Sequence, residues 1–522
     1  MLSAFLGWTN LLCGQNEVKI IFAEQQKTKS FPDSLSASVW VNTYLAKQQN
    51  KGYANIKTTY NINNEWVINK GSKFIIESIY LDSVLIQKEG ILSRYYNRLT
   101  NTVNSKANQG YPFYRIKADS LSVSSHGITS YLSSDSGNKI YFGDINMKKP
   151  LLIKPKIFGR LSRWKVGDDF KYSVWNKLNE QISSLPYLSL AKPPLLTFTN
   201  DSASLSINLA KKSSNQLDVI IGIQTDENNK TEVVADVNLL LYNIAKRTDQ
   251  WELRWSTPEK NTQKLMANAT LPFLFNTPFG YYFNINLLKQ DSSYVKTHIK
   301  NGVAFKPNFF TTFIVYLGKE NINPIGENTE TIETISNQSY GISIHRIKSD
   351  DVFNPSKGLI FMLDFSQGTQ QKLFQETTTT STTFLFEGKL ASFIPVFRKL
   401  ILHQKAHLTK LIKDQITSEE LFEVGGFSSF RGVNERIIRT PSLAYYSFNP
   451  RYRLDKHTYL SVFTDQLWFL NNSTTNYFWS VGAGFAFSTK SGIFNMNYAV
   501  ANTGKGLTLK DGKIHFGYIN VF

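Results

Sequence analysis

The sequence has little cysteine, little charge and no long apolar run. Its single cysteine, Cys13, excludes a disulfide framework and a cysteine-based zinc site. No window approaches about 18 consecutive apolar residues, so no transmembrane helix is expected. Charged residues make up 19% of the chain and aromatic residues 14%, which is unlike a disordered protein. These observations do not exclude a membrane-spanning β-barrel. Apolar and polar residues alternate along its strands, so its mean hydropathy stays low.

Acidic residues are scarce in the first part of the chain. The whole chain has 58 basic and 40 acidic residues and a net charge of +18. Residues 15–212 hold 27 of the basic residues but only 14 of the acidic ones. Such a basic module is attracted to an anionic membrane surface at short range. No nucleic-acid-binding motif is present, so no nucleic acid partner is expected. The basic stretch Lys154–Lys177 fits either a solvated face or a surface against lipid headgroups.

Residues 1–14 are apolar and uncharged. They predict a short secretory signal peptide that is cleaved near Gly14. The alternative is a hydrophobic N-terminal strand. Asn10-Leu11-Leu12 does not match the small-residue pattern that lipidation of Cys13 requires.

Residues 15–213 contain a weak repeat of about 65 residues, in the order strand, helix, strand, strand. The expected helices cover residues 34–50 and 91–108 and the stretch from Asp168-Asp169, a helix N-cap pair, to Ser184. Glycine follows the first two helices, where it supplies the left-handed C′ position. The three units, residues 15–72, 73–138 and 139–213, resemble polypeptide-transport-associated (POTRA) domains.

From residue 214 onward, apolar and polar residues alternate with period two, which predicts β-strands of 9–12 residues. Sixteen such segments are centred near Val219, Asp236, Leu253, Asn268, Asn284, Asn301, Ile314, Ile342, Met362, Glu387, His403, Ser447, Phe463, Gly482, Asn497 and Gly517. Lipid cannot satisfy the open edges of a sheet. The predicted fold is therefore an all-β transmembrane barrel of about 16 antiparallel strands over residues 214–522, with N-terminal α+β domains.

The connection 414–440 interrupts this pattern. It contains LFEVGGFSSFRGVNE, residues 421–435. The second strand after it, centred near Phe463, carries Asp465 on its polar, inward face. Because an arginine fork binds a carboxylate through two parallel bonds, we expect Arg431 to tie the loop to Asp465 inside the barrel. Gly432 allows close backbone approach there. The alternative is an exposed loop arginine.

These features together resemble the BamA/TamA superfamily of outer-membrane proteins. The resemblance is carried by Gly425, Gly426, Phe430, Arg431, Gly432 and Val433, which are similar to the family's VRGF-like loop motif, and by Gly482-Ala483-Gly484. Phe430 stands where the motif has an aliphatic residue, and Val433 stands where it has an aromatic one. Leu467, two residues after Asp465, stands where the family usually has glycine. Phe516, Tyr518 and Phe522 are similar to the C-terminal assembly signal of outer-membrane barrels.

The resemblance implies an outer-membrane assembly or insertion factor that templates client β-strands at the seam between its first and last strands. The N-terminal domains would lie in the periplasm. Implied partners are unfolded outer-membrane or secreted client polypeptides, outer-membrane lipids, and accessory proteins of the periplasm or inner membrane. The alternative is a two-partner-type polypeptide secretion transporter of the same superfamily; the N-terminal domains and the Arg-Gly loop argue against a passive porin.

The sequence carries no sign of an enzyme. It lacks Gly-x-Ser-x-Gly, HExxH and Walker motifs, so no catalytic residue, metal or cofactor is expected. His403 and His407 are four residues apart in a strand-like segment, and we interpret them as wall residues.

Overall fold

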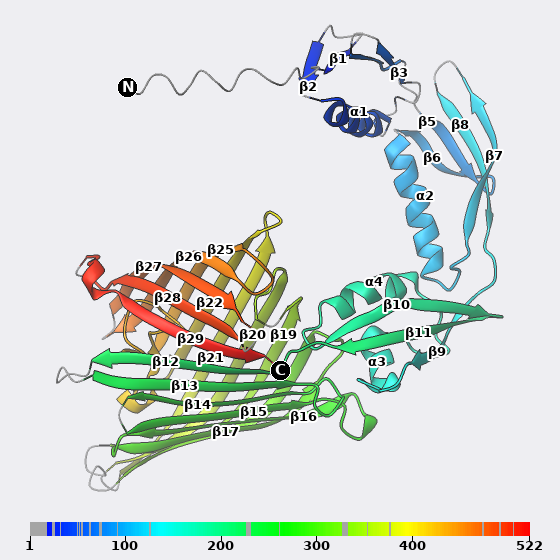
Figure 1. The fold of residues 1–522 in the computed structure, drawn as a ribbon. Coiled ribbons are helices and arrows are strands. Elements are labelled where there is room, and N and C mark those ends of the chain that lie inside the picture. Colours follow the sequence, from blue (N-terminus) through cyan, green and yellow to red (C-terminus); the bar gives the residue numbers. More distant parts are fainter. Residues whose placement is uncertain are drawn as a thin grey trace, which may run out of the picture. The chain divides into compact units, whose positions relative to one another are not determined.

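The computed structural model describes most of the 522-residue chain (Figure 1). The described residues are 18–22, 27–31, 33–49, 51, 53, 56–61, 64–71, 76–90, 92–124, 127–225, 231–259, 261–325, 332–351, 353–374, 377–427, 429–471, 474–489, 492–504 and 506–521. The predicted signal peptide, residues 1–14, and Phe522 lie outside them. The chain divides into two compact units, one of residues 1–142, 167–175 and 198–203, the other of residues 143–166, 176–197 and 204–522.

Three small α+β modules precede the barrel in the sequence. The first has the sheet order β2-β1-β4-β3 and helix α1, and the second has β6-β5-β8-β7 and helix α2. The third has β10-β11-β9 with helices α3 and α4. Their bounds are β1 Val18–Phe22, β2 Lys27–Phe31, α1 Ser34–Gln49, β3 Lys57–Asn61, β4 Glu65–Asn69, β5 Ile76–Leu81, β6 Val84–Gly90, α2 Leu92–Ala107, β7 Arg115–Val123, β8 Ile128–Asp135, β9 Tyr141–Met147, α3 Pro155–Ser162, α4 Tyr172–Ser183, β10 Leu188–Thr199 and β11 Ser202–Lys211.

The sequence pattern did not predict β2, β6 or α3. Strand β6 follows β5 through the turn at Asp82-Ser83, where both residues have positive φ. Such hairpin turns usually carry Asn-Gly or Asp-Gly. Because glycine is missing here, the sequence does not show that a hairpin is formed. Helix α3 has only eight residues and begins with Pro155 in its first turn, which fits a helix start but leaves little periodicity to detect.

The C-terminal part is a closed barrel of sixteen antiparallel strands, as predicted. The strands are β12 Gln216–Thr225, β13 Thr231–Tyr242, β14 Gln250–Glu259, β15 Thr262–Leu271, β16 Phe279–Gln290, β17 Tyr294–Phe305, β18 Thr311–Pro324, β19 Thr334–Ser349, β20 Gly358–Phe374, β21 Thr377–Pro395, β22 Leu400–Ile412, β25 Ser442–Arg453, β26 Tyr459–Asn471, β27 Thr474–Ser488, β28 Ile493–Asn502 and β29 Lys513–Val521. Each predicted centre falls inside one strand. The expected length of 9–12 residues was wrong for β18–β22, β26 and β27, which run to 13–19 residues.

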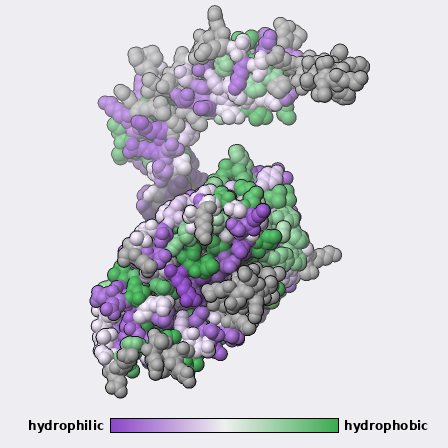
Figure 2. Space-filling model, turned by 90° about the vertical axis from the view of Figure 1, so that its left-hand side faces the viewer, coloured by the Kyte–Doolittle hydropathy of each residue, from purple (hydrophilic) through white to green (hydrophobic). Residues whose placement is uncertain are grey.

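The outside of the barrel is apolar and the inside is polar. Leu317 and Val462 point outward and are 71% and 61% exposed, whereas the inward-facing Asp364 and Asp465 are buried. Figure 2 shows hydrophobic residues gathered on the barrel surface. A sheet with an apolar exterior and a polar lumen is typical of barrels that span membranes. No helix among the described residues is long and apolar enough to cross a membrane.

The two ends of the barrel differ. At one end, which we name the domain-side rim, β12 begins, β29 ends and short turns such as 243–249 and 306–310 join the strands. Residues 143–166 of the third module belong to the same compact unit as the barrel. The longest connection, residues 413–441, leaves from the opposite rim.

Candidate functional site: the loop inside the barrel

The loop between β22 and β25 folds into the barrel and crosses it. It contains the short helix η3 Ser418–Glu420 and a two-stranded sheet of β23 Phe422–Val424 and β24 Ile438–Thr440. Three well-separated wall strands bind it. Lys296 of β17 donates to the Glu419 carbonyl at 3.3 Å, Lys372 of β20 to the Gln415 carbonyl at 3.3 Å, and Arg436 of the loop to Ser256 of β14 at 3.1 Å.

The structure places Arg431 against Asp465 of strand β26. The guanidinium donates from Nε to Asp465 Oδ2 at 2.7 Å and from Nη2 to Oδ1 at 2.6 Å, which is a bidentate pair. Nη2 also donates to Ser447 Oγ at 3.0 Å, and the guanidinium carbon lies 3.3 Å from the centre of the Phe463 ring. Arg431 is 7% exposed and Asp465 is completely buried. The loop is thereby held to the wall by a shielded ion pair rather than by a solvated contact.

Glycines let the loop approach the wall and turn tightly. Gly432 has φ +92°, and a Cβ added there would lie 2.9 Å from the backbone nitrogen of Ala501 in β28. Gly425 and Gly426 also have positive φ, and a Cβ on Gly425 would lie 2.6 Å from the Asn434 carbonyl oxygen. Any larger residue at Gly432 would therefore push the Arg431 segment away from β28.

Phe430 and Val433 flank the arginine inside one buried apolar cluster. The cluster also contains Leu467 and Phe469 of β26, and Phe430 and Leu467 are both completely buried. Leu467, the residue that stands where the superfamily usually has glycine, supplies side-chain volume on the wall next to the loop. The two departures from the family pattern thus meet in the same place.

Sequence reasoning missed a second attachment of the loop. Glu420 accepts hydrogen bonds from Lys413 and from Gln370 of β20, the latter at 2.6 Å, and it closes a capping box with Thr417 at the start of η3. The side chains of Lys413 and Glu420 are 0% and 3% exposed. The local signal was the spacing Thr417-x-x-Glu420, which is typical of a helix N-terminus.

A third attachment of the loop borders a cavity in the described part of the lumen. Glu423 binds Lys264 of β15 and lies near Arg439. A cavity of about 520 Å³ lies between the loop and strands β14–β21, lined by Lys264, Glu420, Glu423 and Arg436 among others. The loop therefore narrows the lumen and leaves on one side a charged space that is large enough for several water molecules.

The barrel closes through a short seam. Strands β12 and β29 share six residue pairs, from Gln216–Val521 to Ile221–Phe516, whereas β12 and β13 share ten. Residues 222–225 of β12 and 513–515 of β29 have no partner across the seam among the described residues. Backbone donors and acceptors there are left open for another strand.

Two of the three predicted C-terminal signal residues lie in β29, and Phe522 is outside the described residues. Phe516 points outward and is 42% exposed. Its ring lies 5.8 Å from that of Phe494, which in turn lies 4.8 Å from that of Tyr518. These rings form an aromatic patch on the outer wall next to the seam.

His403 and His407 lie in strand β22 of the barrel wall, as interpreted from the sequence. His403 accepts from Arg451 at 2.7 Å and stacks on Phe393, and His407 lies 3.3 Å from Glu387. Within the described ranges, no three His, Cys, Asp or Glu side chains are grouped so as to hold a metal ion.

No protein-family model and no curated protein sequence matches the chain. Among solved structures, CdiB from Acinetobacter baumannii is similar over 94% of this chain and 98% of its own, with a TM-score of 0.55 and 11% identity. CdiB from Escherichia coli matches over the same shares with a TM-score of 0.52 and 11% identity. BamA from Haemophilus ducreyi lacking POTRA domains 1–3 matches over 84% and 95% with a TM-score of 0.46 and 11% identity. The likeness to the CdiB structures establishes the fold, which is a closed barrel preceded by small α+β domains. This is the fold that the sequence's resemblance to the BamA/TamA superfamily implies.

Proposed function

We propose that this chain is an outer-membrane protein that assembles client polypeptides at its β12–β29 seam, with the three N-terminal modules, residues 15–72, 73–138 and 139–213, in the periplasm. It would act without covalent chemistry, cofactor or metal. Its partners would be unfolded outer-membrane or secreted polypeptides, membrane lipids, and accessory proteins of the periplasm or inner membrane.

The short seam carries this proposal. An extended client strand adds to an open sheet edge through main-chain hydrogen bonds, which give affinity without requiring one sequence. Residues 222–225 and 513–515 provide such edges, and six residue pairs are fewer to separate than the ten between β12 and β13. The loop anchored at Asp465 keeps the lumen narrowed while the wall opens.

A disulfide across the seam tests the proposal. Val219 and Tyr518 are directly paired, so Val219→Cys with Tyr518→Cys can lock β12 to β29. The matched control is Leu239→Cys with Leu253→Cys, a directly paired set in β13 and β14 away from the seam. We expect the oxidised seam lock to stop accumulation of outer-membrane barrels in a depletion strain and a reductant to restore it. Full activity of the oxidised seam lock would exclude assembly through this edge.

The second candidate is a polypeptide secretion transporter of the two-partner type. It is favoured by the likeness to the two CdiB structures, each of which has a TM-score above 0.5. In that case the loop would be a plug, and the client would pass through the lumen. Depletion separates the two functions, since loss of many outer-membrane barrels indicates assembly and loss of one secreted protein with normal barrels indicates secretion.

A further inference from the structure

The segment that leads into and out of helix α3 carries basic residues but no acidic ones. Between residues 145 and 167 there are seven Lys or Arg and no Asp or Glu. Six of the seven are exposed, and we name them the rim patch: Lys148, Lys149, Lys154, Lys156, Arg163 and Lys165. Within the described residues, the first five of these make no hydrogen bond or ion pair to a carboxylate, so their charges remain open to an external anion.

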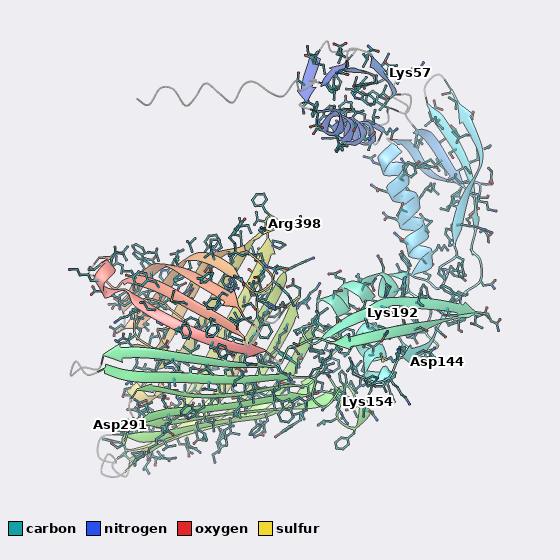
Figure 3. All side chains as sticks on the ribbon, viewed as in Figure 1. Lys57, Asp144, Lys154, Lys192, Asp291 and Arg398 are labelled. Carbon is teal, nitrogen blue, oxygen red and sulfur yellow. The ribbon has the colours of Figure 1, made fainter. Side chains whose placement is uncertain are left out.

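Contacts with three barrel turns fix α3 at the domain-side rim. The Asn243 side chain donates to the Leu152 carbonyl at 2.9 Å. Phe158 packs edge-on against Phe309 with ring centres 5.5 Å apart, and Arg160 donates to the Asn276 carbonyl at 3.4 Å. Figure 3 shows Lys154 beside the turns at this end of the barrel. The rim patch therefore keeps a fixed height relative to the barrel wall.

The turns next to α3 add apolar tips and no exposed acid. Phe275 is 91% exposed and Ile244 is 55% exposed at the ends of their turns. The one carboxylate in turns 243–249, 272–278 and 306–310 is Asp249, which is completely buried and accepts from the Ala245 N–H and from Trp251. Exposed aromatic and aliphatic tips beside lysines are typical of the boundary between a bilayer and water.

We propose that the rim patch binds the anionic phospholipid surface of the leaflet that surrounds the domain-side rim. The lysine ammonium groups would meet lipid phosphates while Phe275 and Ile244 enter the interface. This inference rests on the proposed membrane location but not on the proposed assembly activity. The patch would hold residues 143–166 of the third module against the membrane.

The number of basic residues sets the expected size of the effect. A Lys next to an anionic bilayer contributes roughly a fivefold gain in binding, falling off within a Debye length. Removal of three such residues is expected to weaken anionic-lipid binding by at least about fivefold, because not every lysine contacts a phosphate at once.

The test uses the full chain in mild detergent and counts bound lipids by mass spectrometry of the intact complex. Phosphatidylglycerol and phosphatidylcholine with the same acyl chains are titrated separately. The test variant is Lys148→Gln, Lys154→Gln, Lys156→Gln. The control is Lys47→Gln, Lys51→Gln, Lys57→Gln in the first module, which removes the same charge from equally exposed positions (Lys57 is labelled in Figure 3).

We expect the unmodified chain to prefer phosphatidylglycerol, the test variant to lose most of that preference and the control to keep it. Equal binding of the two lipids by the unmodified chain, or equal losses in both variants, would overturn the proposal. The gel-mobility shift of the folded barrel on heating shows whether each variant has folded. If the test variant does not fold, the salt dependence of the unmodified chain decides instead, since unchanged phosphatidylglycerol binding between about 0.05 and about 0.5 M salt contradicts a charge-based surface.

Discussion

Asp465 accepts hydrogen bonds from both the side chain and the main chain of Arg431. Beside the bidentate guanidinium contact, the backbone N–H of Arg431 donates to Asp465 Oδ2 at 3.2 Å. The two residues are therefore unequal partners. Truncating Arg431 leaves one bond to the wall, whereas truncating Asp465 removes all three and leaves a buried guanidinium without its counter-charge.

We predict that Asp465→Ala destabilises the barrel more than Arg431→Ala. Breaking a buried ion pair costs about 3–5 kcal/mol, and less in a lumen that contains water. Arg431→Lys is expected to recover only part of the loss, because an ammonium cannot form two parallel bonds. The measurement is the midpoint of the heat-induced gel shift for both single variants and the double variant, treated as a double-mutant cycle.

The charge swap Arg431→Asp with Asp465→Arg gives a further check on this pair. Some stability should return if the contact is direct. Strictly additive single effects would mean that the loop is held by its other attachments, at Glu420 and Glu423.

Leu467→Ala should destabilise the barrel through the apolar cluster around Phe430. Both side chains are completely buried, and removing a buried leucine costs roughly 2–5 kcal/mol because the cavity fills only partly. The control is Leu460→Ala on the same strand, where the side chain is 48% exposed on the outer face and lipid or detergent fills the space. Unfolding in urea, followed by intrinsic fluorescence, measures both. Equal effects would contradict the special role of the cluster.

The sequence predicted those parts of the structure that repeat at short range. Alternation identified all sixteen strands, because successive residues of a barrel strand face lipid and the water-filled lumen in turn. It also gave Asp465 its inward side, and the Arg-Gly motif then indicated its partner. The seam length and the path of the loop across the lumen depend on where distant strands come to lie, so neither could be predicted.

The Lys413–Glu420 pair is a second feature that depends on a distant strand and could not be predicted from the sequence. Both residues lie near the start of the loop, and their spacing alone does not distinguish a solvated pair from a buried one. The neighbour that completes the cluster, Gln370, is some 50 positions away in β20. Only the closed barrel brings these three side chains together.

Glu420→Gln should release the start of the loop. The buried ammonium of Lys413 would lose its counter-charge, at a cost of about 3 kcal/mol if it stays in place, so we expect the segment around Lys413 to move into solvent instead. Trypsin added to folded protein would then cut after Lys413. Glu419→Gln is the matched control, since the adjacent Glu419 carboxylate accepts only from Ser418 among the contacts of the described residues. Protection of Lys413 in the Glu420 variant would show that this cluster does not hold the loop.

Gly432→Ala tests whether the close approach of the loop to β28 matters beyond backbone conformation. Gly432 and Gly504 have nearly the same φ, +92° and +98°, so alanine imposes a similar conformational cost of roughly 1–2 kcal/mol at either position. They differ in their surroundings: a Cβ on Gly432 meets the backbone of Val500 and Ala501 at 2.9–3.0 Å, whereas none of the described residues lies within 4 Å of one on Gly504. Gly432→Ala should therefore lower the heat-shift midpoint clearly more than Gly504→Ala. It should also weaken the Arg431–Asp465 pair, so that adding Asp465→Ala to Gly432→Ala costs less than it does in the unmodified chain. Equal midpoints for the two glycine variants would show that β28 yields to the added methyl group and that the loop is positioned by its ion pairs alone.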